Sequence, residues 1–334
     1  MADVGLGQLV TATGRRRSKK AKDACRDNLP VTKHMEEAGG IRRVSGGRTV
    51  VEEALSDQND TVNWVGPAGQ SSLADNNILD AAEFNWFYML GSVVFTLSEQ
   101  YMNEGPEQYI PLISSKFKVL ESTQMNKFHE GVLSAGTGVG GLQMAGLASH
   151  VSTTPTTGTV GGINRASADA VWFRNLKFDT AGDWSDGAVD AGNVTRFLDK
   201  GLDATTINAM PQVQLGLLGQ THWEALCSST RAIQQIVSDK DTARVGHNKI
   251  FYRGIPMYLS GGINYSGFTT QTVTRTYLLN VEEGGFNIVF HKKAEFDMLE
   301  PVNSSDQAAV SRLMFTMATC TIGAFAKRNW VGFD

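Results

Sequence analysis

The sequence predicts an α+β fold, and three observations lead to this prediction. Strand-like text fills residues 48–97, one long amphipathic helix is expected over residues 106–129, and strands alternate with helices from residue 170 to about residue 280. The chain has 334 residues, which exceeds the roughly 250–300 residues at which single cores stop growing. We therefore expect one large domain or two interleaved domains.

Residues 48–97 are expected to form a long excursion of two or three strands. The stretches 48–55, 61–65 and 83–97 are rich in β-branched and aromatic residues. A ribbon of this kind is marginally stable alone because no second layer covers its apolar face. The body of the protein or a neighbouring molecule should cover it, and Trp64, near its outer part, is a candidate anchor between subunits.

Residues 106–129 carry a clear helical pattern. Pro106 suits the first turn of a helix. A mostly apolar stripe then follows in steps of three or four residues through Tyr109, Ile113, Phe117, Leu120, Gln124 and Phe128. At a rise of 1.5 Å per residue this helix would span about 36 Å, a length suited to a structural spine.

The remaining text predicts a compact α/β unit followed by extended strands. A loop region rich in Gly, Ser and Thr at 131–162 precedes an expected strand at 170–173, a helix at 193–207, a strand at 212–218 and a helix from 221 to about 237. Further strands are expected at 250–259, 274–281, 287–299 and 313–325.

Charge is distributed unevenly along the chain. Residues 1–50 contain eleven Lys or Arg and five Asp or Glu, a balance of +6, whereas the remaining residues carry −10. Six of these cations lie within eight residues, as Arg15, Arg16, Arg17, Lys19, Lys20 and Lys22. Such a block favours an extended arm or an isolated helix, which is either solvated or in contact with DNA or an acidic scaffold.

The sequence contains no convincing catalytic, cofactor-binding or metal-binding site. Gly136, Gly138 and Gly141 match the spacing of a dinucleotide fingerprint, but a helix precedes them where a strand is required. The six histidines are scattered, the three cysteines are far apart, and no serine lies in a nucleophile elbow. No apolar run approaches the roughly 18–20 residues of a membrane span, and no signal pattern opens the chain, so we expect a soluble protein.

Four blocks of the sequence resemble the major capsid proteins of tailed bacteriophages. These blocks are Ile41 to Glu52, Ala81 to Trp86, Gly158 to Arg165 and Trp172 to Asn175, and the resemblance covers roughly residues 40–330. It implies the Hong Kong 97-type capsid fold, with an N-terminal arm, an extended β loop, a peripheral domain with a long spine helix and long β sheet, and an α/β axial domain.

The resemblance also implies a placement for each segment. Residues 1–47 would be the arm, 48–97 the extended loop and the start of the peripheral domain, and 98–134 the part of that domain with the spine helix. Residues 135–284 would be the axial domain, and 285–334 the return strands of the peripheral domain.

The implied function is that of a head protein with no enzymatic activity. Copies would assemble as pentamers and hexamers into an icosahedral shell around the phage double-stranded DNA genome. A separate scaffolding protein, a portal and a decoration protein are the implied further partners, with no cofactor and no membrane. The chain would be found in the virion, and in the host cytoplasm during assembly.

Two alternatives remain open from the sequence. One is the shell protein of a cellular nanocompartment, similar to an encapsulin, which has the same fold and encloses cargo enzymes. The other is an α/β oxidoreductase that uses a nucleotide cofactor at Gly136 to Gly141, a distant third because the motif lacks its strand.

Overall fold

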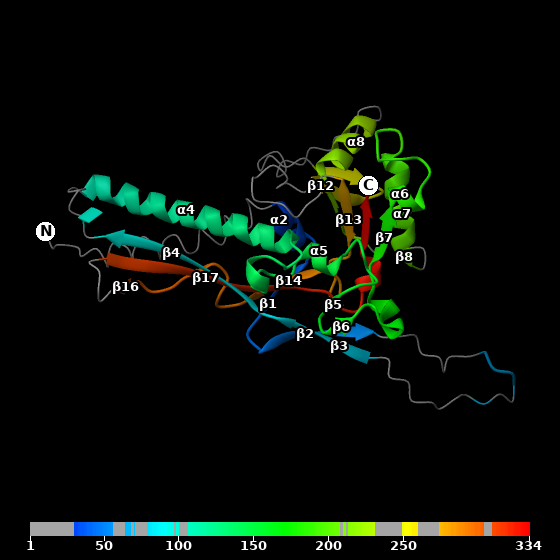
Figure 1. Cartoon of the computed structure of the whole chain (residues 1–334), viewed down its shortest axis with the longest axis horizontal. Coiled ribbons are helices and arrows are strands. Elements are labelled where there is room, and N and C mark those ends of the chain that lie inside the picture. Colours follow the sequence, from blue (N-terminus) through cyan, green and yellow to red (C-terminus); the bar gives the residue numbers. More distant parts are fainter. Residues whose placement is uncertain are drawn as a thin grey trace.

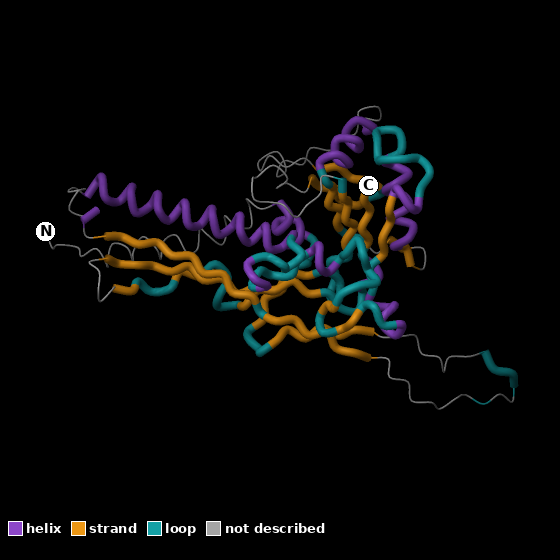
Figure 2. Tube along the Cα trace, viewed as in Figure 1, coloured by secondary structure: helices purple, strands orange, loops and turns teal. Residues whose placement is uncertain are grey.

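The computed structural model describes residues 30–55, 64–67, 70, 79–96, 98–99, 106–207, 210–211, 213–230, 249–259, 274–303 and 309–334. Its two larger sheets have six strands each, and a long helix lies alongside the more elongated one (Figures 1 and 2). The α-helices of this part of the chain are α2 (Pro30–Glu37), α4 (Pro106–Leu133), α5 (Leu147–His150), α6 (Thr180–Asp183), α7 (Val194–Thr205) and α8 (Gln220–Thr230).

The elongated sheet is built around strand β17 (Ala309–Thr321). β17 pairs antiparallel with β4 (Phe87–Thr96) along one edge. Its other edge pairs with β14 (Asn287–His291), β15 (Asp297–Met298) and β16 (Val302–Asn303). β1 (Ile41–Val44) extends this sheet by parallel pairing with β14, so segments from both ends of the described chain meet here.

Helix α4 packs on one face of the β4–β17 pair, which confirms the predicted spine helix. Phe117 and Phe128 of its apolar stripe are buried, and the Phe117 ring lies 5.5 Å from that of Phe95. Gly91 of β4 allows this approach, because a Cβ atom there would lie only 2.6 Å from Leu120 Cδ1. A glycine inside a strand therefore marks a close approach of helix and sheet.

The second sheet has the strand order β11-β12-β10-β13-β18-β7. Its strands are β7 (Leu176–Asp179), β10 (Leu215–Leu218), β11 (Lys249–Tyr252), β12 (Ile255–Leu259), β13 (Arg275–Leu279) and β18 (Trp330–Phe333). Alternate residues of β10 pack on opposite sides: Leu217 joins the core cluster that contains α2, whereas Leu218 joins the cluster that contains α7 and α8. Burial on both faces explains why this strand contains no polar residue.

Three two-stranded sheets and three 3-10 helices complete the described part. The pairs are β2 (Thr49–Leu55) with β3 (Leu79–Asn85), β5 (Thr159–Val160) with β6 (Ile163–Asn164), and β8 (Thr206–Ile207) with β9 (Met210–Pro211). The 3-10 helices cover Val139–Gly141, Ala168–Phe173 and Ala326–Arg328.

Several predicted elements differ in the structure. The strand expected at 170–173 is a 3-10 helix, which Ser167 caps by accepting a hydrogen bond from the Asp169 amide. Trp64 and Val65 are not in a strand, and the rest of 61–65 lies outside the described residues. The stretch 83–97 is divided at Trp86, so its second half leaves the ribbon and pairs with β17.

The end of the chain also departs from the predicted arrangement. Residues 330–333 were expected among the return strands of the peripheral sheet, but β18 lies between β13 and β7 in the α/β sheet. The predicted division into domains is otherwise not tested by this arrangement and stays a prediction.

Candidate assembly surfaces

The β2–β3 ribbon is anchored on its own subunit at its base. Val50, Ala82 and Phe84 on one face are buried, whereas Val51 on the opposite face is 56% exposed. Trp86, just after the ribbon, is also buried and donates its indole N–H to the Gly47 carbonyl at 3.0 Å. Most aromatic residues of 83–97 therefore belong to the subunit's own core, so the body of the protein, one of the two expected covers, is the one that covers them.

Trp64 differs from these residues because its side chain is fully exposed, at 105% of the reference area. The short segment 64–67 lies well apart from the ribbon base (Figure 1). An indole in this position contributes nothing to the subunit core. Its role as an anchor between subunits stays a prediction.

The block Gly158 to Arg165 contacts the ribbon base and holds it in place. Its hairpin, β5–β6, accepts a hydrogen bond at the Gly161 carbonyl from the Glu83 amide at 2.9 Å. Gly161 has a φ of 56°, and a Cβ atom there would lie 2.8 Å from the Ala82 Cβ. Only glycine fits both the left-handed backbone and the close approach.

Arg165 and Arg174 hold this hairpin against the body of the subunit. Arg165 is completely buried and donates to the carbonyls of Ser149 and His150. Arg174 donates in turn to the carbonyls of Arg165 and Ser167, both at 2.8 Å. Two residues of the blocks that carry the family resemblance therefore serve as structural ties.

Opposite α4, one face of the β4–β17 pair is left open by the elements that the structure describes. Odd-numbered residues of β4 point toward the helix, and even-numbered residues point away from it, as the alternating burial shows. Tyr88 and Leu90 on the open face are 63% and 61% exposed, and the Tyr88 ring stacks on Phe315 with centroids 6.1 Å apart. This surface was not among the sequence predictions, although the period-two pattern of 87–96 could have indicated it.

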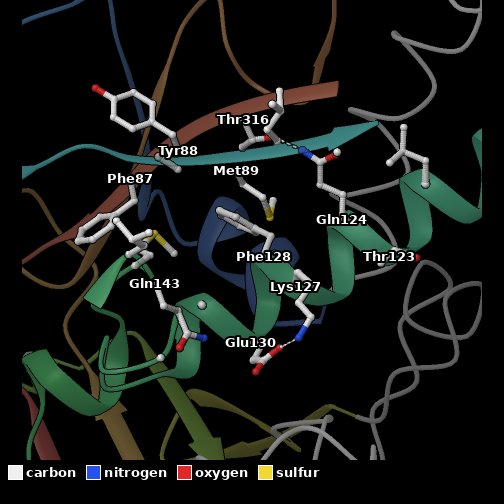
Figure 3. A pocket seen from close by; sticks show the side chains of 18 residues that line it. Phe87, Tyr88, Met89, Thr123, Gln124, Lys127, Phe128, Glu130, Gln143 and Thr316 are labelled. Carbon is white, nitrogen blue, oxygen red and sulfur yellow. Dashed lines mark hydrogen bonds and ion pairs between the residues drawn. The ribbon is translucent and has the colours of Figure 1, made fainter. Parts of the chain in front are cut away.

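An open groove of about 650 Å³ lies between α4, β4 and the loop that follows α4 (Figure 3). Its lining is mostly apolar, with Phe87, Met89, Leu120, Phe128, Leu142 and Met144. Leu142, at its rim, is 75% exposed. Two charged residues on its wall form an ion pair with each other, with Lys127 Nζ 2.7 Å from Glu130 Oε2.

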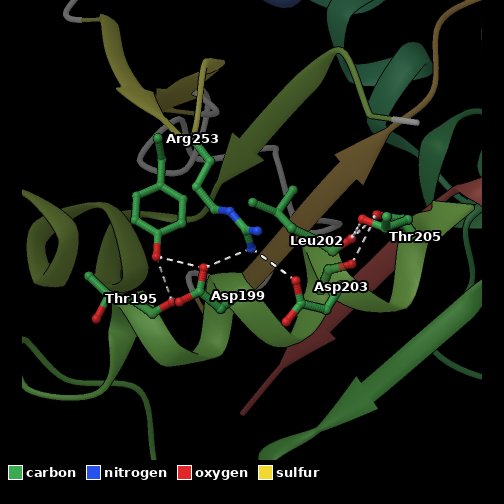
Figure 4. Close-up of polar contacts among 9 residues, drawn as sticks. Thr195, Asp199, Leu202, Asp203, Thr205 and Arg253 are labelled. Carbon is green, nitrogen blue, oxygen red and sulfur yellow. Dashed lines mark hydrogen bonds and ion pairs between the residues drawn. The ribbon is translucent and has the colours of Figure 1, made fainter. Parts of the chain in front are cut away.

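A polar cluster fixes the β11–β12 hairpin to α7 (Figure 4). Arg253 at the turn donates from Nη1 to Asp199 at 3.2 Å and to Asp203 at 2.9 Å. The Tyr252 hydroxyl donates to Asp199 at 2.9 Å and to the Thr195 carbonyl at 3.1 Å. Burial and the nearby Asp199 carboxylate raise the pKa of Tyr252, so the phenol stays protonated and keeps donating.

A second polar group has the composition of a catalytic triad but not its accessibility. His222 contacts Thr276 Oγ1 at 2.8 Å through Nδ1 and Asp334 Oδ2 at 3.1 Å through Nε2. His222 and Thr276 are completely buried, so a substrate cannot reach the hydroxyl. Asp334 also accepts from Thr180 and from the Val189 amide, which makes the group a tie between α8, β13 and the end of β18.

The structure offers no support for a cofactor at Gly136 to Gly141. These residues follow α4 and form a turn and a 3-10 helix, so the strand required before a dinucleotide loop is missing there. No group of three His, Cys, Asp or Glu within the described ranges is placed to hold a metal ion. None of the helices in these ranges is both long and apolar enough to cross a bilayer.

The basic cluster of Arg15, Arg16, Arg17, Lys19, Lys20 and Lys22 lies outside the described residues. Its contact with DNA or scaffold therefore stays a prediction.

Comparison with solved structures identifies the architecture. No protein-family model and no curated protein sequence matches the chain. The capsid protein in the asymmetric unit of cyanophage A-1(L) is similar, with a TM-score of 0.66 at 14% identity over 92% of each chain. A Gordonia phage Cozz structure gives 0.55 at 12% identity, covering 90% of this chain and 85% of that one.

An encapsulin also has a similar architecture. The SrpI encapsulin of Synechococcus elongatus PCC 7942 gives a TM-score of 0.52 at 12% identity, covering 88% of this chain and 84% of that one. These three likenesses each cover 88–92% of this chain. The chain therefore has the Hong Kong 97-type fold of phage capsid proteins.

Proposed function

We propose that this chain is the major capsid protein of a tailed phage, a structural subunit that assembles with copies of itself into a closed icosahedral shell. The observation that carries the proposal is the likeness to the cyanophage A-1(L) capsid protein over 92% of both chains. The open face at Tyr88 and Leu90 and the exposed Trp64 are surfaces that neighbouring copies would cover.

The shell would consist of pentamers and hexamers and would enclose double-stranded DNA. Scaffolding protein and portal would act during assembly in the host cytoplasm, and a decoration protein would add to the finished virion. The basic cluster at 15–22 supports an inner surface that contacts scaffold or DNA, since cations concentrated on one arm give a polyanion one preferred docking surface. The role is structural, without catalysis.

The encapsulin likeness favours a second candidate, a protein shell that encloses cargo enzymes. The two candidates differ in what the basic arm contacts. An enclosed genome requires an inner surface that tolerates phosphate, whereas a cargo shell requires a groove that docks a cargo peptide.

Electron microscopy and light scattering of the purified chain test both candidates. Co-expression with the scaffolding protein of its phage should give particles of megadalton mass, and DNA should be retained when the packaging components are supplied. Closed shells that form without scaffold and that capture a co-purifying enzyme would favour the nanocompartment. A strictly monomeric product under both conditions would refute the shell function, and stoichiometric binding of nicotinamide or flavin would revive the oxidoreductase alternative.

A further inference from the structure

Strand β4 has one edge paired with β17, and no strand of the described chain occupies its second edge. Two contacts identify the backbone groups that point to this second edge. Lys116 Nζ donates to the Val94 carbonyl at 3.3 Å, and the Thr96 amide donates to the Glu99 carboxylate at 3.3 Å. Because alternate residues of a strand direct their backbone groups the same way, the outward set continues through Ser92, Leu90 and Tyr88.

The hydrogen bonds of β17 give the same assignment independently. Leu313 and Met317 use backbone groups to pair away from β4, with the Leu299 amide at 2.9 Å and the Ala294 carbonyl at 2.9 Å. The even-numbered residues of β17 therefore face β4. They lie opposite the odd-numbered residues of β4, for example Met314 opposite Gly91, so the even-numbered residues of β4 face outward.

This outward edge is blocked at one end and open at the other. The ion pair of Lys116 with Glu99, at 2.6 Å, covers the edge at Val94 and Thr96. The rest of the edge runs through residues 88–92, of which residues 88–91 line the groove described above. An unblocked strand edge beside an apolar groove is the geometry that accepts an added strand.

We propose that residues 4–13 of a second copy of this chain add as a strand to the open edge of β4, with alternate side chains directed into the groove. The inference rests on the proposed assembly of copies and specifies one contact between them. The β4 edge would supply backbone hydrogen bonds, and the groove would select small apolar side chains.

The composition of residues 4–13 fits this groove. The segment contains no charged residue and no proline, and its Val10 and Thr11 are β-branched residues that favour strands. Its charge-free character matches a groove whose own charged pair is neutralised. The excursion at 56–78 fits less well, because it contains Pro67 and three aspartates.

The length of the chain before α2 permits the contact. Residues 1–29 precede Pro30, and an extended chain covers up to about 3.3 Å per residue, so the stretch 14–29 allows the proposed strand to lie up to roughly 50 Å from Pro30. The basic cluster follows the proposed strand directly, so docking of residues 4–13 would also fix where the cations at 15–22 emerge.

A labelled peptide of residues 1–14 tests the contact on the isolated subunit. The subunit should lack residues 1–14, and fluorescence anisotropy should show saturable binding. Leu90→Pro removes an outward amide that β17 does not use, and should weaken binding by roughly tenfold or more. Leu90→Ala keeps that amide and serves as the matched control, with affinity within about threefold of the parent.

Modified peptides keep the test valid if Leu90→Pro does not fold. N-methylation at Leu9 and N-methylation at Val10 remove neighbouring amides that point to opposite sides of a strand. One of the two peptides should lose binding and the other should retain it. Equal binding of both peptides, or no saturable binding by the unmodified peptide, would overturn the proposal.

Hydrogen exchange in assembled shells tests whether residues 4–13 are the segment that pairs with the open edge of β4. The amides of Leu90 and Ser92 should be protected in shells of the full chain and should exchange fast in shells of the chain that lacks residues 1–14. Protection that persists without residues 1–14 would assign the edge to another segment and overturn the proposal. Failure of the full chain to form shells would instead refute the proposed function, and the peptide assay would still decide the strand contact.

Discussion

Arg165 donates from Nη2 to the backbone carbonyl of His150 at 2.5 Å, and both residues are buried in the core. A second donor of the same guanidinium reaches the Ser149 carbonyl at 3.3 Å. Burial lowers the pKa of Arg165 to about 10, so the group is still charged at neutral pH. A buried cation thus satisfies two carbonyls at the place where the β5–β6 hairpin meets the body.

Arg165→Met should lower the free energy of unfolding of the subunit by roughly 2–5 kcal/mol, because two buried carbonyls lose their donor. Urea denaturation of the unassembled subunit measures the change. The control is Arg196→Met, which removes an exposed arginine paired with Asp186 and should cost less than about 1 kcal/mol. Equal losses of unfolding free energy from the two substitutions would contradict a stabilising role for the hydrogen bonds of Arg165.

Gly161→Ala should destabilise the ribbon base more than Gly158→Ala does. Both glycines have positive φ, but a Cβ at Gly161 meets Ala82 and Phe84, whereas a Cβ at Gly158 meets no atom within 4 Å. Backbone strain of about 1 kcal/mol is common to both variants, so the difference isolates the steric contact. Faster hydrogen exchange of the Glu83 amide in Gly161→Ala alone is the expected readout.

Trp64→Ala should leave the stability of the unassembled subunit within about 0.5 kcal/mol of the parent, because the indole is fully exposed. Assembled shells of this variant should melt at a lower temperature. The matched variant is Trp86→Ala, which removes a buried indole and should cost the subunit about 3–5 kcal/mol. Shells of Trp64→Ala that melt like the parent would remove Trp64 from the contacts between subunits.

Stability should fall as pH decreases from about 6.5 to about 4. Burial lowers the pKa of His129 and of His150 to about 4 in the folded subunit, and Arg165 adds to the effect at His150. The unfolded chain therefore binds these protons first, near a pKa of about 6.5. Each histidine contributes stability that is present above this range and lost across it, on the order of 3 kcal/mol.

Urea denaturation at several pH values measures this slope. The slope of unfolding free energy against pH reports how many more protons the unfolded chain binds than the folded subunit. His150→Phe should reduce this difference by about one proton between pH 6.5 and pH 4. An unchanged pH dependence of stability in His150→Phe would show that residues other than His150 cause it.

Reversal of Arg15, Arg16 and Arg17 to Glu should leave the subunit folded and should abolish assembly or genome retention. If phosphates are the partner, binding of the parent to duplex DNA should weaken with salt by about 0.9 in log–log slope for each neutralised phosphate. The triple reversal should lower that slope. DNA-filled particles at parental yield from the reversed variant would contradict the proposal.

The spine helix was predictable because its stripe repeats with the helical period over many residues. Phe117, Gln124 and Phe128 of that stripe are all buried in the structure. The predicted helix at 193–207 and the strand at 48–55 likewise correspond to α7 and β2. In these segments local sequence pattern and tertiary packing agree.

The predictions were wrong or incomplete where the structure depends on contacts between segments that are distant in the sequence or on a capping residue outside the apolar run. The apolar run at 170–173 is too short to distinguish a strand from a helical turn. The Ser167 side chain caps and so stabilises the 3-10 helix that forms there. Periodicity also cannot tell which strand β4 will pair with, and its partner β17 lies more than 200 residues later. The groove beside α4 involves residues 87–144 together with Thr316 and Ala318, so no single stretch of sequence indicates it.

The position of β18 constrains the order in which the protein can fold during synthesis. β7 pairs with β18, which the ribosome makes about 150 residues later, and β13 also takes β18 as a neighbour. Until residues 330–333 have emerged from the ribosome, Leu176–Asp179 has no partner in the sheet and two strand edges remain open. A nascent chain stalled before these residues should therefore be prone to aggregate and to recruit chaperones, even though its spine helix is already complete.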